Sequence, residues 1–203
     1  GPLPNGVTTP PSGARVAEDD DPGFRIVASE AIARAGFFEV ERLTVAAPDG
    51  VRHQRDVVRH PGAVTIIPID DDGRAVLVRQ YRAAVDSTLL EAPAGKRDVD
   101  GETPEATATR ELAEELGLAA GRMVSLAECY NSPGFCDEYA YIFAAFDLTD
   151  LGGSRPEGPE ERAMTVERIP LGDTERLVSA RELVDAKTII GLLLARELVA
   201  PQR

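Results

Sequence analysis

Residues 95–118, GKRDVDGETPEATATRELAEELGL, constrain the fold more than any other segment, because both ends of one acidic helix can be recognised in them. Thr103 can cap the helix, Pro104 suits its first position, and Glu105 favours the positive end of the helix dipole. Gly117 is a typical residue just beyond a helix C-terminus. We therefore predict a helix that begins at Pro104 and ends just before Gly117.

The glutamates of this helix are spaced as a metal site would need them. Glu111, Glu114 and Glu115 stand at i, i+3 and i+4, so they crowd one face, while Leu112 and Leu116 point toward a core. Like charges at this spacing cost roughly 0.2–0.5 kcal/mol per exposed pair. A hard divalent cation would turn that cost into a ligand set, because Mg²⁺ takes one or two carboxylates together with substrate phosphates. The pattern indicates a site that cleaves pyrophosphates.

The helix alone leaves an alternative open. A stretch such as RELAEEL is also common as a solvated charged face, and Arg110 could then be only a surface partner of Glu114 at i+4. The surrounding sequence has to decide between a metal site and a solvated face.

Composition excludes several classes of function. The net charge of −13 argues against a general affinity for nucleic acid, although a cation could still attract a small anionic substrate. No apolar run approaches the roughly 18 residues of a membrane span. Cys129 and Cys136 make no disulfide framework, which favours a cytoplasmic protein. Residues 1–22 are rich in Gly, Pro and Asp and are predicted to be a disordered tail.

The remaining chain alternates strand-like runs with turns, and it contains helices at two places. Residues 174–199 are expected to be helical in two pieces, and 150–161 to form a long loop. We predict an α+β fold with an N-terminal antiparallel β arm at 23–61 and a catalytic domain at 62–203. The arm is expected to form a contact between the two subunits of a dimer. The predicted strands cover residues 23–30, 37–46, 51–59, 63–69, 74–81, 123–130, 138–148 and 163–169.

The acidic helix and its flanks together resemble the Nudix box, the loop–helix–loop signature of Nudix hydrolases. The order Gly95, Glu102, Arg110-Glu111, Glu114-Glu115, Gly117 follows the box from Glu102 onward. One departure precedes the helix, where six residues instead of five separate Gly95 from Glu102. This insertion lies in a loop and should be tolerated, but it leaves the role of Glu102 open.

The resemblance implies a Nudix-type α/β/α sandwich with a mixed sheet and a Mg²⁺ site, with Mn²⁺ as a possible substitute. Glu111 and Glu115 are then expected to be direct ligands, with Glu114 next, which could act through water. The backbone carbonyl of Ala94 would complete the protein ligands. Arg110 would orient a glutamate instead of touching the substrate. Glu114, Glu115 and Arg110 are also the catalytic candidates of the helix, because the metal would activate the attacking water.

Motifs outside the box resemble ADP-ribose pyrophosphatases over residues 24–199. They are RQYR at 79–82, LEAPAG at 90–95, SPGFCDE at 132–138 and DAKT at 185–188. Guanidinium groups suit phosphate oxygens, although arginines on strands can be plain surface charges and the Ser-Pro-Gly stretch can be only a turn. The candidate substrate-binding residues are Arg55, Arg82, Glu91, Ser132, Gly134, Asp137 and Glu138.

Glu160 and Glu161 end the long loop and are further catalytic candidates. In ADP-ribose pyrophosphatases a glutamate from this loop positions or deprotonates the attacking water, which suits a general base on a closing loop. The alternative is a solvated loop, and the sequence does not distinguish the two glutamates.

The resulting hypothesis is a homodimeric enzyme that hydrolyses ADP-ribose to AMP and ribose 5-phosphate. A hydrolase of another nucleoside diphosphate sugar or derivative is the alternative within the class. An alternative of another class is a non-catalytic, ADP-ribose-binding regulatory domain. A Ser–His–Asp hydrolase would need a G-x-S-x-G elbow, which the chain lacks. The expected partners are a small nucleotide substrate and a second copy of the chain, with no nucleic acid and no membrane.

Overall fold

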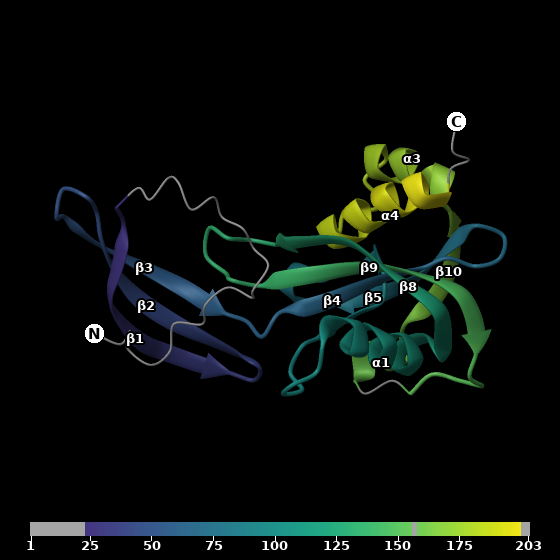
Figure 1. Ribbon diagram of the computed structural model, residues 1–203, viewed down its shortest axis with the longest axis horizontal. Coiled ribbons are helices and arrows are strands. Elements are labelled where there is room, and N and C mark those ends of the chain that lie inside the picture. Colours follow the sequence, from purple (N-terminus) through teal and green to yellow (C-terminus); the bar gives the residue numbers. More distant parts are fainter. Residues whose placement is uncertain (1–22, 156–157, 200–203) are drawn as a thin grey trace.

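The computed structural model describes residues 23–155 and 158–199, so the predicted tail at 1–22 lies outside the described residues. The body has three layers (Figure 1), with helix α1 (Pro104–Leu116) below two sheets and helices α3 and α4 above them. This arrangement confirms the expected α/β/α sandwich. None of the described helices combines the length and the apolar character needed to span a bilayer.

The central sheet of the body is mixed, as predicted. Its strand order is β7-β4-β9-β8, with β4 parallel to β9 and the other neighbours antiparallel. A second, antiparallel sheet has the order β10-β5-β6. The strands are β4 (Ala63–Pro68), β5 (Arg74–Arg82), β6 (Ser87–Glu91), β7 (Ala94–Lys96), β8 (Leu118–Tyr130), β9 (Tyr139–Asp150) and β10 (Thr165–Pro170).

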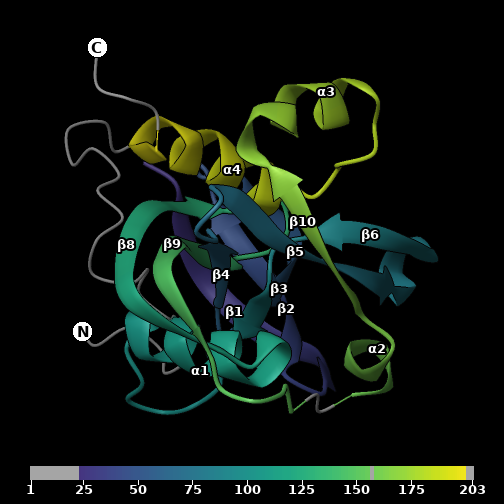
Figure 2. The ribbon, with the colours of Figure 1, turned by 90° about the vertical axis from the view of Figure 1, so that its right-hand side faces the viewer.

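Two predicted boundaries in the body were wrong. Strand β8 begins at Leu118, directly after the helix stop, and not at residue 123, because pairing with β9 extends it through Leu118 and Asp150. The loop predicted at 150–161 ends in one helical turn, α2 (Pro159–Arg162) (Figure 2), which starts with a proline at its N-terminus. The remaining elements are α3 (Thr174–Ser179), α4 (Ala186–Val199) and the 3-10 turns η1 (Ala83–Val85) and η2 (Leu171–Asp173).

The core consists of two apolar clusters, one on each face of the central sheet. Ile66 packs in the cluster that contains Leu112 of α1, and Ile67 packs in the cluster that contains Leu192 of α4. Successive side chains of a strand point to opposite faces, so a strand covered on both faces is apolar at most positions. This explains why β4 is apolar except at Thr65, which is also buried.

The N-terminal strands form a separate antiparallel sheet that projects from one end of the body (Figure 1). It consists of β1 (Arg25–Ala35), β2 (Phe38–Ala46) and β3 (Arg52–Arg59), and we call it the arm. Strand β1 continues past the predicted end at residue 30 because it pairs with β2 along its whole length. Every residue of β1 is exposed, including Ile26, Val27 and Ile32.

Candidate active site

Helix α1 has the predicted ends. The Thr103 hydroxyl accepts a hydrogen bond from the Ala106 amide at 3.2 Å, and Pro104 occupies the first turn. Gly117 adopts φ 64°, and its amide donates to the Ala113 carbonyl at 3.0 Å. A residue with a side chain would be strained in this left-handed conformation, so the glycine ends the helix where the sequence predicts.

Glu111 projects from α1 directly onto the backbone of β7. A Cβ atom at Gly95 would overlap with the Glu111 carboxylate, so only glycine allows this approach. Burial raises the pKa of Glu111, although the neighbouring Arg110 opposes the shift. The glycine that opens the box segment therefore makes room for a half-desolvated carboxylate.

Glu115 lies one turn further along α1 and is the most buried carboxylate of the helix, at 8% exposure. Its Oε2 accepts a hydrogen bond from the Ala94 amide at 3.3 Å. Burial, and then the charge of Glu111, raise the pKa of Glu115 to about 8. A divalent cation would offset both causes, and two carboxylates with a backbone carbonyl are the hard oxygen donors that Mg²⁺ and Mn²⁺ take. The residues present therefore fit such an ion.

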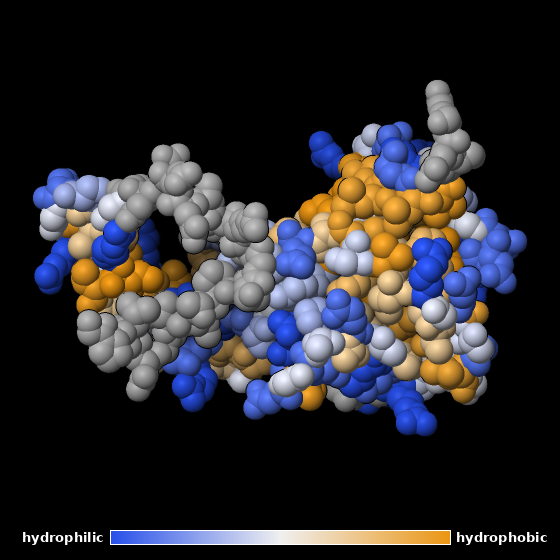
Figure 3. Space-filling model, viewed as in Figure 1, coloured by the Kyte–Doolittle hydropathy of each residue, from blue (hydrophilic) through white to orange (hydrophobic). Residues whose placement is uncertain are grey.

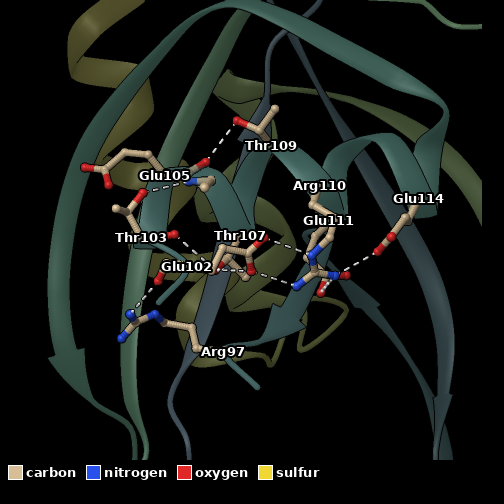
Figure 4. Close-up of polar contacts among 10 residues, drawn as sticks. Arg97, Glu102, Thr103, Glu105, Thr107, Thr109, Arg110, Glu111 and Glu114 are labelled. Atoms are coloured by element: carbon tan, nitrogen blue, oxygen red, sulfur yellow. Dashed lines mark hydrogen bonds and ion pairs between the residues drawn. The ribbon is translucent and has the colours of Figure 1, made fainter. Parts of the chain in front are cut away.

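Arg110 binds three glutamates at once (Figure 4). Its Nη1 donates to Glu111 Oε1 and to Glu114 Oε2, each at 2.9 Å. Its Nε and Nη2 donate to the two oxygens of Glu102 at 3.2 Å each, and these bonds lower the pKa of Glu102. Thr107 also donates to Glu102, at 2.9 Å. The additional residue in the loop therefore leaves Glu102 in contact with the box helix, where Glu102 binds Arg110.

The carboxylates do not converge on one point. Within the described ranges, no three His, Cys, Asp or Glu side chains are grouped closely enough to hold a metal ion by themselves. Glu114 and Glu111 both bind Arg110, but Glu111 also lies against Gly95, and Glu115 binds the Ala94 amide. Water and substrate phosphates would have to supply further ligands, which is usual for Mg²⁺.

Arg82 and Glu91 form an ion pair on neighbouring strands beside these carboxylates. Arg82 Nε lies 3.0 Å from Glu91 Oε1, and the Glu91 side chain is almost completely buried. Burial lowers the pKa of Arg82, but the bond to Glu91 and the charges of Glu115 and Asp185 outweigh it and raise the pKa. Arg82 therefore lies in the electrostatic field of Glu115.

The two glutamates of α2 have different surroundings. Burial is the largest cause of the raised pKa values of Glu111 and Glu115, and the charge of Glu161 is a smaller cause in both cases. Glu160 instead acts on Tyr81, whose pKa is raised chiefly by its hydrogen bond to Asp86. Glu161 is thus the loop glutamate on the side of the box carboxylates.

The loop between β8 and β9 lies at the base of the arm. The Val58 amide donates to the Phe135 carbonyl at 2.7 Å, and Val58 pairs with Cys136 in a parallel bridge. Asp137 accepts hydrogen bonds from the His60 amide at 2.8 Å and from Arg59 at 3.1 Å. The expected substrate-binding residues of this loop are Ser132, Gly134, Asp137 and Glu138.

Arg55 is the expected site residue that lies farthest along the arm. It is exposed on β3, and its Nη1 donates to the Gln54 carbonyl at 2.8 Å. The structure therefore gathers Arg82, Glu91 and Glu161 with the box carboxylates. It leaves Arg55 and the 132–138 loop with the arm.

Two hollows lie outside the carboxylate cluster. One, of about 310 Å³, lies between the end of α1 at Leu116, the 150–153 segment and Val166. The other, of about 260 Å³, lies between β3 and the 132–137 segment. Neither is lined by Glu111 or Glu115. The candidate active site is therefore placed at Glu111 and Glu115, because the volume of a hollow carries no information about reactivity.

Two groups that support the site had no role assigned to them from the sequence, although Thr188 belongs to the DAKT motif at 185–188. Arg59 joins Glu41 of the arm to Asp137 of the loop, with distances of 2.8 and 3.1 Å. Thr188 is completely buried and accepts a hydrogen bond from the Ala92 amide at 2.8 Å. The sequence signal for the second group was Asp185 three residues before Thr188, a spacing typical of helix capping. Arg59 carries no comparable local signal.

Comparison with known proteins places the chain in a family. Residues 58–186 match the family model described as NUDIX domain. The chain is 38% identical to an ADP-ribose pyrophosphatase of Bacillus subtilis (strain 168) over 81% of this chain and 88% of that protein. It is 39% identical to an ADP-ribose pyrophosphatase of Mycobacterium tuberculosis (strain ATCC 25618 / H37Rv), over 88% and 84% respectively.

A solved structure agrees with these matches. The crystal structure of an ADP compounds hydrolase superposes with a TM-score of 0.75 at 30% identity, covering 87% of this chain and 94% of that chain. The likeness extends from the family segment to most of both chains. The chain belongs to the Nudix family and is a hydrolase of nucleoside diphosphate derivatives.

Proposed function

We propose that the enzyme hydrolyses the pyrophosphate bond of ADP-ribose to AMP and ribose 5-phosphate and that it depends on Mg²⁺. The observation that carries the metal dependence is the buried pair Glu111 and Glu115, packed against the Ala94–Gly95 backbone. The ADP-ribose pyrophosphatases among its relatives support the substrate.

The box segment would hold the metal. Glu111, Glu115 and the Ala94 carbonyl are the proposed ligands, with Glu114 as a further one. Arg110 would keep Glu111 and Glu114 in place through its hydrogen bonds. Bound Mg²⁺, or Mn²⁺, polarises phosphate oxygens and makes a water a better nucleophile near neutral pH.

The residues around the box would bind and activate the reactants. Glu161 is the proposed general base, because its charge acts on Glu111 and Glu115, and Glu160 is its neighbour on the same turn. Arg82 is proposed to bind a phosphate oxygen, and the buried Glu91 would fix the orientation of its guanidinium group.

A second copy of the chain would complete the substrate site. The exposed apolar side chains of β1 support a homodimer built through the arm, because such side chains gain by leaving water. Arg55 would then reach the site from the arm, with Ser132, Gly134 and Glu138 as further substrate contacts and Asp137 as the residue that holds their loop. We also propose a cytoplasmic location, in keeping with the free thiols of Cys129 and Cys136.

One alternative substrate class has specific support. The chain is 31% identical to a GDP-mannose pyrophosphatase of Enterobacter sp. (strain 638) over 73% of its length. The chemistry at the box would be unchanged, and only the residues that bind the base and the sugar would differ. We prefer ADP-ribose because the matches to ADP-ribose pyrophosphatases have higher identity and cover more of the chain.

A substrate panel tests the proposal. The purified protein is incubated with ADP-ribose, other ADP-sugars and GDP-mannose, with Mg²⁺, with Mn²⁺ and with EDTA, and release of AMP or GMP is followed. We expect rapid AMP release from ADP-ribose that requires the metal. Faster GMP release from GDP-mannose would overturn the substrate assignment and keep the reaction class. Binding of ADP-ribose without turnover under all metal conditions would contradict hydrolysis of this substrate.

A further inference from the structure

Helix α4 lies on the side of the sheets opposite α1 (Figure 2). Its N-terminus contacts the entrance to the box segment through the hydrogen bond between Thr188 and Ala92. Asp185 precedes the helix, and its Oδ2 accepts hydrogen bonds from the Thr188 amide at 2.9 Å and from the Thr188 hydroxyl at 2.7 Å. Its Oδ1 lies 3.0 Å from Lys187 Nζ. Both oxygens of Asp185 are therefore engaged, and one of them holds the Thr188 hydroxyl.

The Thr188 hydroxyl uses both of its hydrogen-bonding functions. Its hydrogen points to Asp185, so an oxygen lone pair is left for the Ala92 amide, which donates to it at 2.8 Å. Thr188 is completely buried and Ala92 is nearly so. Loss of the hydroxyl would leave the buried Ala92 amide without its partner, which such groups rarely tolerate.

The backbone that follows Ala92 carries the contacts of the carboxylates. The Pro93 carbonyl accepts from the Ile66 amide of β4 at 2.9 Å, which fixes the next residue. The Ala94 amide then donates to Glu115, and Gly95 lies under the Glu111 carboxylate. A short stretch of chain is thus anchored by α4 and β4 on one side and meets both buried carboxylates on the other.

We propose that Asp185 and Thr188 are positioning residues for the metal site, because they fix the backbone that sets Glu111 and Glu115 against Ala94 and Gly95. The inference rests on the proposed function of those carboxylates. Neither residue need touch the metal or the substrate. Outer partners of this kind typically change metal affinity or activity by about 10–100-fold when they are removed.

Three variants separate positioning from stability. Thr188→Val removes the hydroxyl and keeps the shape, and Thr188→Ser restores the hydroxyl. Thr174→Val is the matched control, because Thr174 is also completely buried and its hydroxyl donates to the Leu171 carbonyl at 2.8 Å, at the start of α3. The primary readout is Mn²⁺ binding without substrate, measured by electron paramagnetic resonance, with the Mg²⁺ concentration for half-maximal activity as the second.

Thr188→Val is expected to weaken Mn²⁺ binding by about 10-fold or more. Thr188→Ser is expected to stay close to wild type, and Thr174→Val to lose stability with unchanged Mn²⁺ affinity. A folded Thr188→Val protein with wild-type Mn²⁺ affinity would overturn the proposal, and so would an equal loss of affinity in Thr174→Val.

A further variant, Asp185→Ala, tests the proposal if Thr188→Val does not fold. Asp185→Ala leaves Thr188 in place but frees its hydroxyl to rotate, so we expect an intermediate loss of Mn²⁺ affinity. Wild-type affinity in folded Asp185→Ala protein would count against the positioning role. The test is separable from the proposed function: wild-type protein that binds Mn²⁺ but hydrolyses no ADP-ribose refutes only the substrate, whereas protein that binds no Mn²⁺ refutes both.

Discussion

Similar apolar side chains are buried in the body and exposed in the arm. Ile142 in the central sheet has 0% exposure, whereas Ile32 on β1 has 46%. The body covers both faces of its central strands with helices, whereas no helix among the described residues packs on the three-stranded sheet of the arm (Figure 1). Figure 3 shows apolar side chains of the arm at the molecular surface. The body therefore has a core of its own, whereas apolar side chains of β1 stay exposed.

Charged groups show the same contrast. Arg42 and Asp56 face each other across the arm with bonds of 2.8 and 2.9 Å, and both remain in contact with solvent. In the body, the Glu91 side chain is only 4% exposed while it binds Arg82. Exposed pairs add little to stability, but removal of one partner from a buried pair leaves an uncompensated charge. Breaking the Arg82–Glu91 pair should therefore cost more stability than breaking the Arg42–Asp56 pair.

The largest effect is expected on catalysis by the body, where α2 provides two adjacent glutamates, Glu160 and Glu161, for a matched comparison. Glu161→Gln is expected to lower kcat for ADP-ribose by about 10²–10⁴-fold, because a general base contributes on that order. Glu160→Gln, on the same turn, should retain most of the activity. Steady-state kinetics at saturating Mg²⁺ measure both. The reverse order of the two variants would show that the loop turns its other glutamate to the substrate.

Stability should also divide the two regions. Ile142→Ala is expected to lower the free energy of unfolding by about 2–5 kcal/mol, because it removes a fully buried side chain from the core. Ile32→Ala should change it by no more than about 0.5 kcal/mol in a monomer. Urea unfolding at several protein concentrations makes the comparison. In the proposed dimer the loss in Ile32→Ala should be larger and should depend on protein concentration, so a small loss at every concentration would contradict a dimer contact through β1.

The buried carboxylate of Glu115 should make the stability of the body depend on pH. The pKa of Glu115 is raised from 4.5 to about 8, so folding favours its protonated form. Without metal, this contribution to stability is fully present below pH 4.5 and is lost as pH rises to about 8. Thermal unfolding in EDTA should therefore show wild type losing stability relative to Glu115→Gln across this range. Parallel curves for the two proteins would contradict the raised pKa.

The smallest expected effect lies at the junction of the two regions. Arg59→Met removes the link between Glu41 of the arm and Asp137 of the loop, so KM for ADP-ribose should rise by at most about fivefold with little change in kcat. Arg42→Met is the control, because its partner Asp56 belongs to the arm alone. Equal KM values for the two variants would show that the arm does not position the loop.

Local signals in the sequence predicted the parts of the fold that depend on neighbours along the chain. Thr103, Pro104 and Gly117 define the ends of α1 through contacts within four residues, and the structure has these ends. The alternation of strand-like runs and turns predicted most strands in the same way, whereas the α/β/α arrangement of the layers was implied by the resemblance to the Nudix box. The start of β8 was wrong because it depends on pairing with a distant strand.

The supporting parts of the site could not be predicted, because they depend on contacts between distant segments. Thr188 and Ala92 are 96 residues apart, and Arg59 and Asp137 are 78 apart. Adjacent glutamates in a loop look alike in sequence, and Glu161 differs from Glu160 here in that its charge contributes to the raised pKa values of Glu111 and Glu115. The roles assigned to all these side chains stay predictions until variants are measured.

One measurement tests the central claim most directly: the rate of AMP release from ADP-ribose by wild type and by Glu115→Gln over a range of Mg²⁺ concentrations. We expect wild type to release AMP only in the presence of the metal. The rate of the variant at saturating Mg²⁺ should be lower by about 10³-fold, because a metal centre contributes several kcal/mol to such a reaction. The variant should be at least as stable as wild type in EDTA, since it lacks a buried charge. A folded variant that releases AMP within about tenfold of the wild-type rate at every Mg²⁺ concentration would contradict the account.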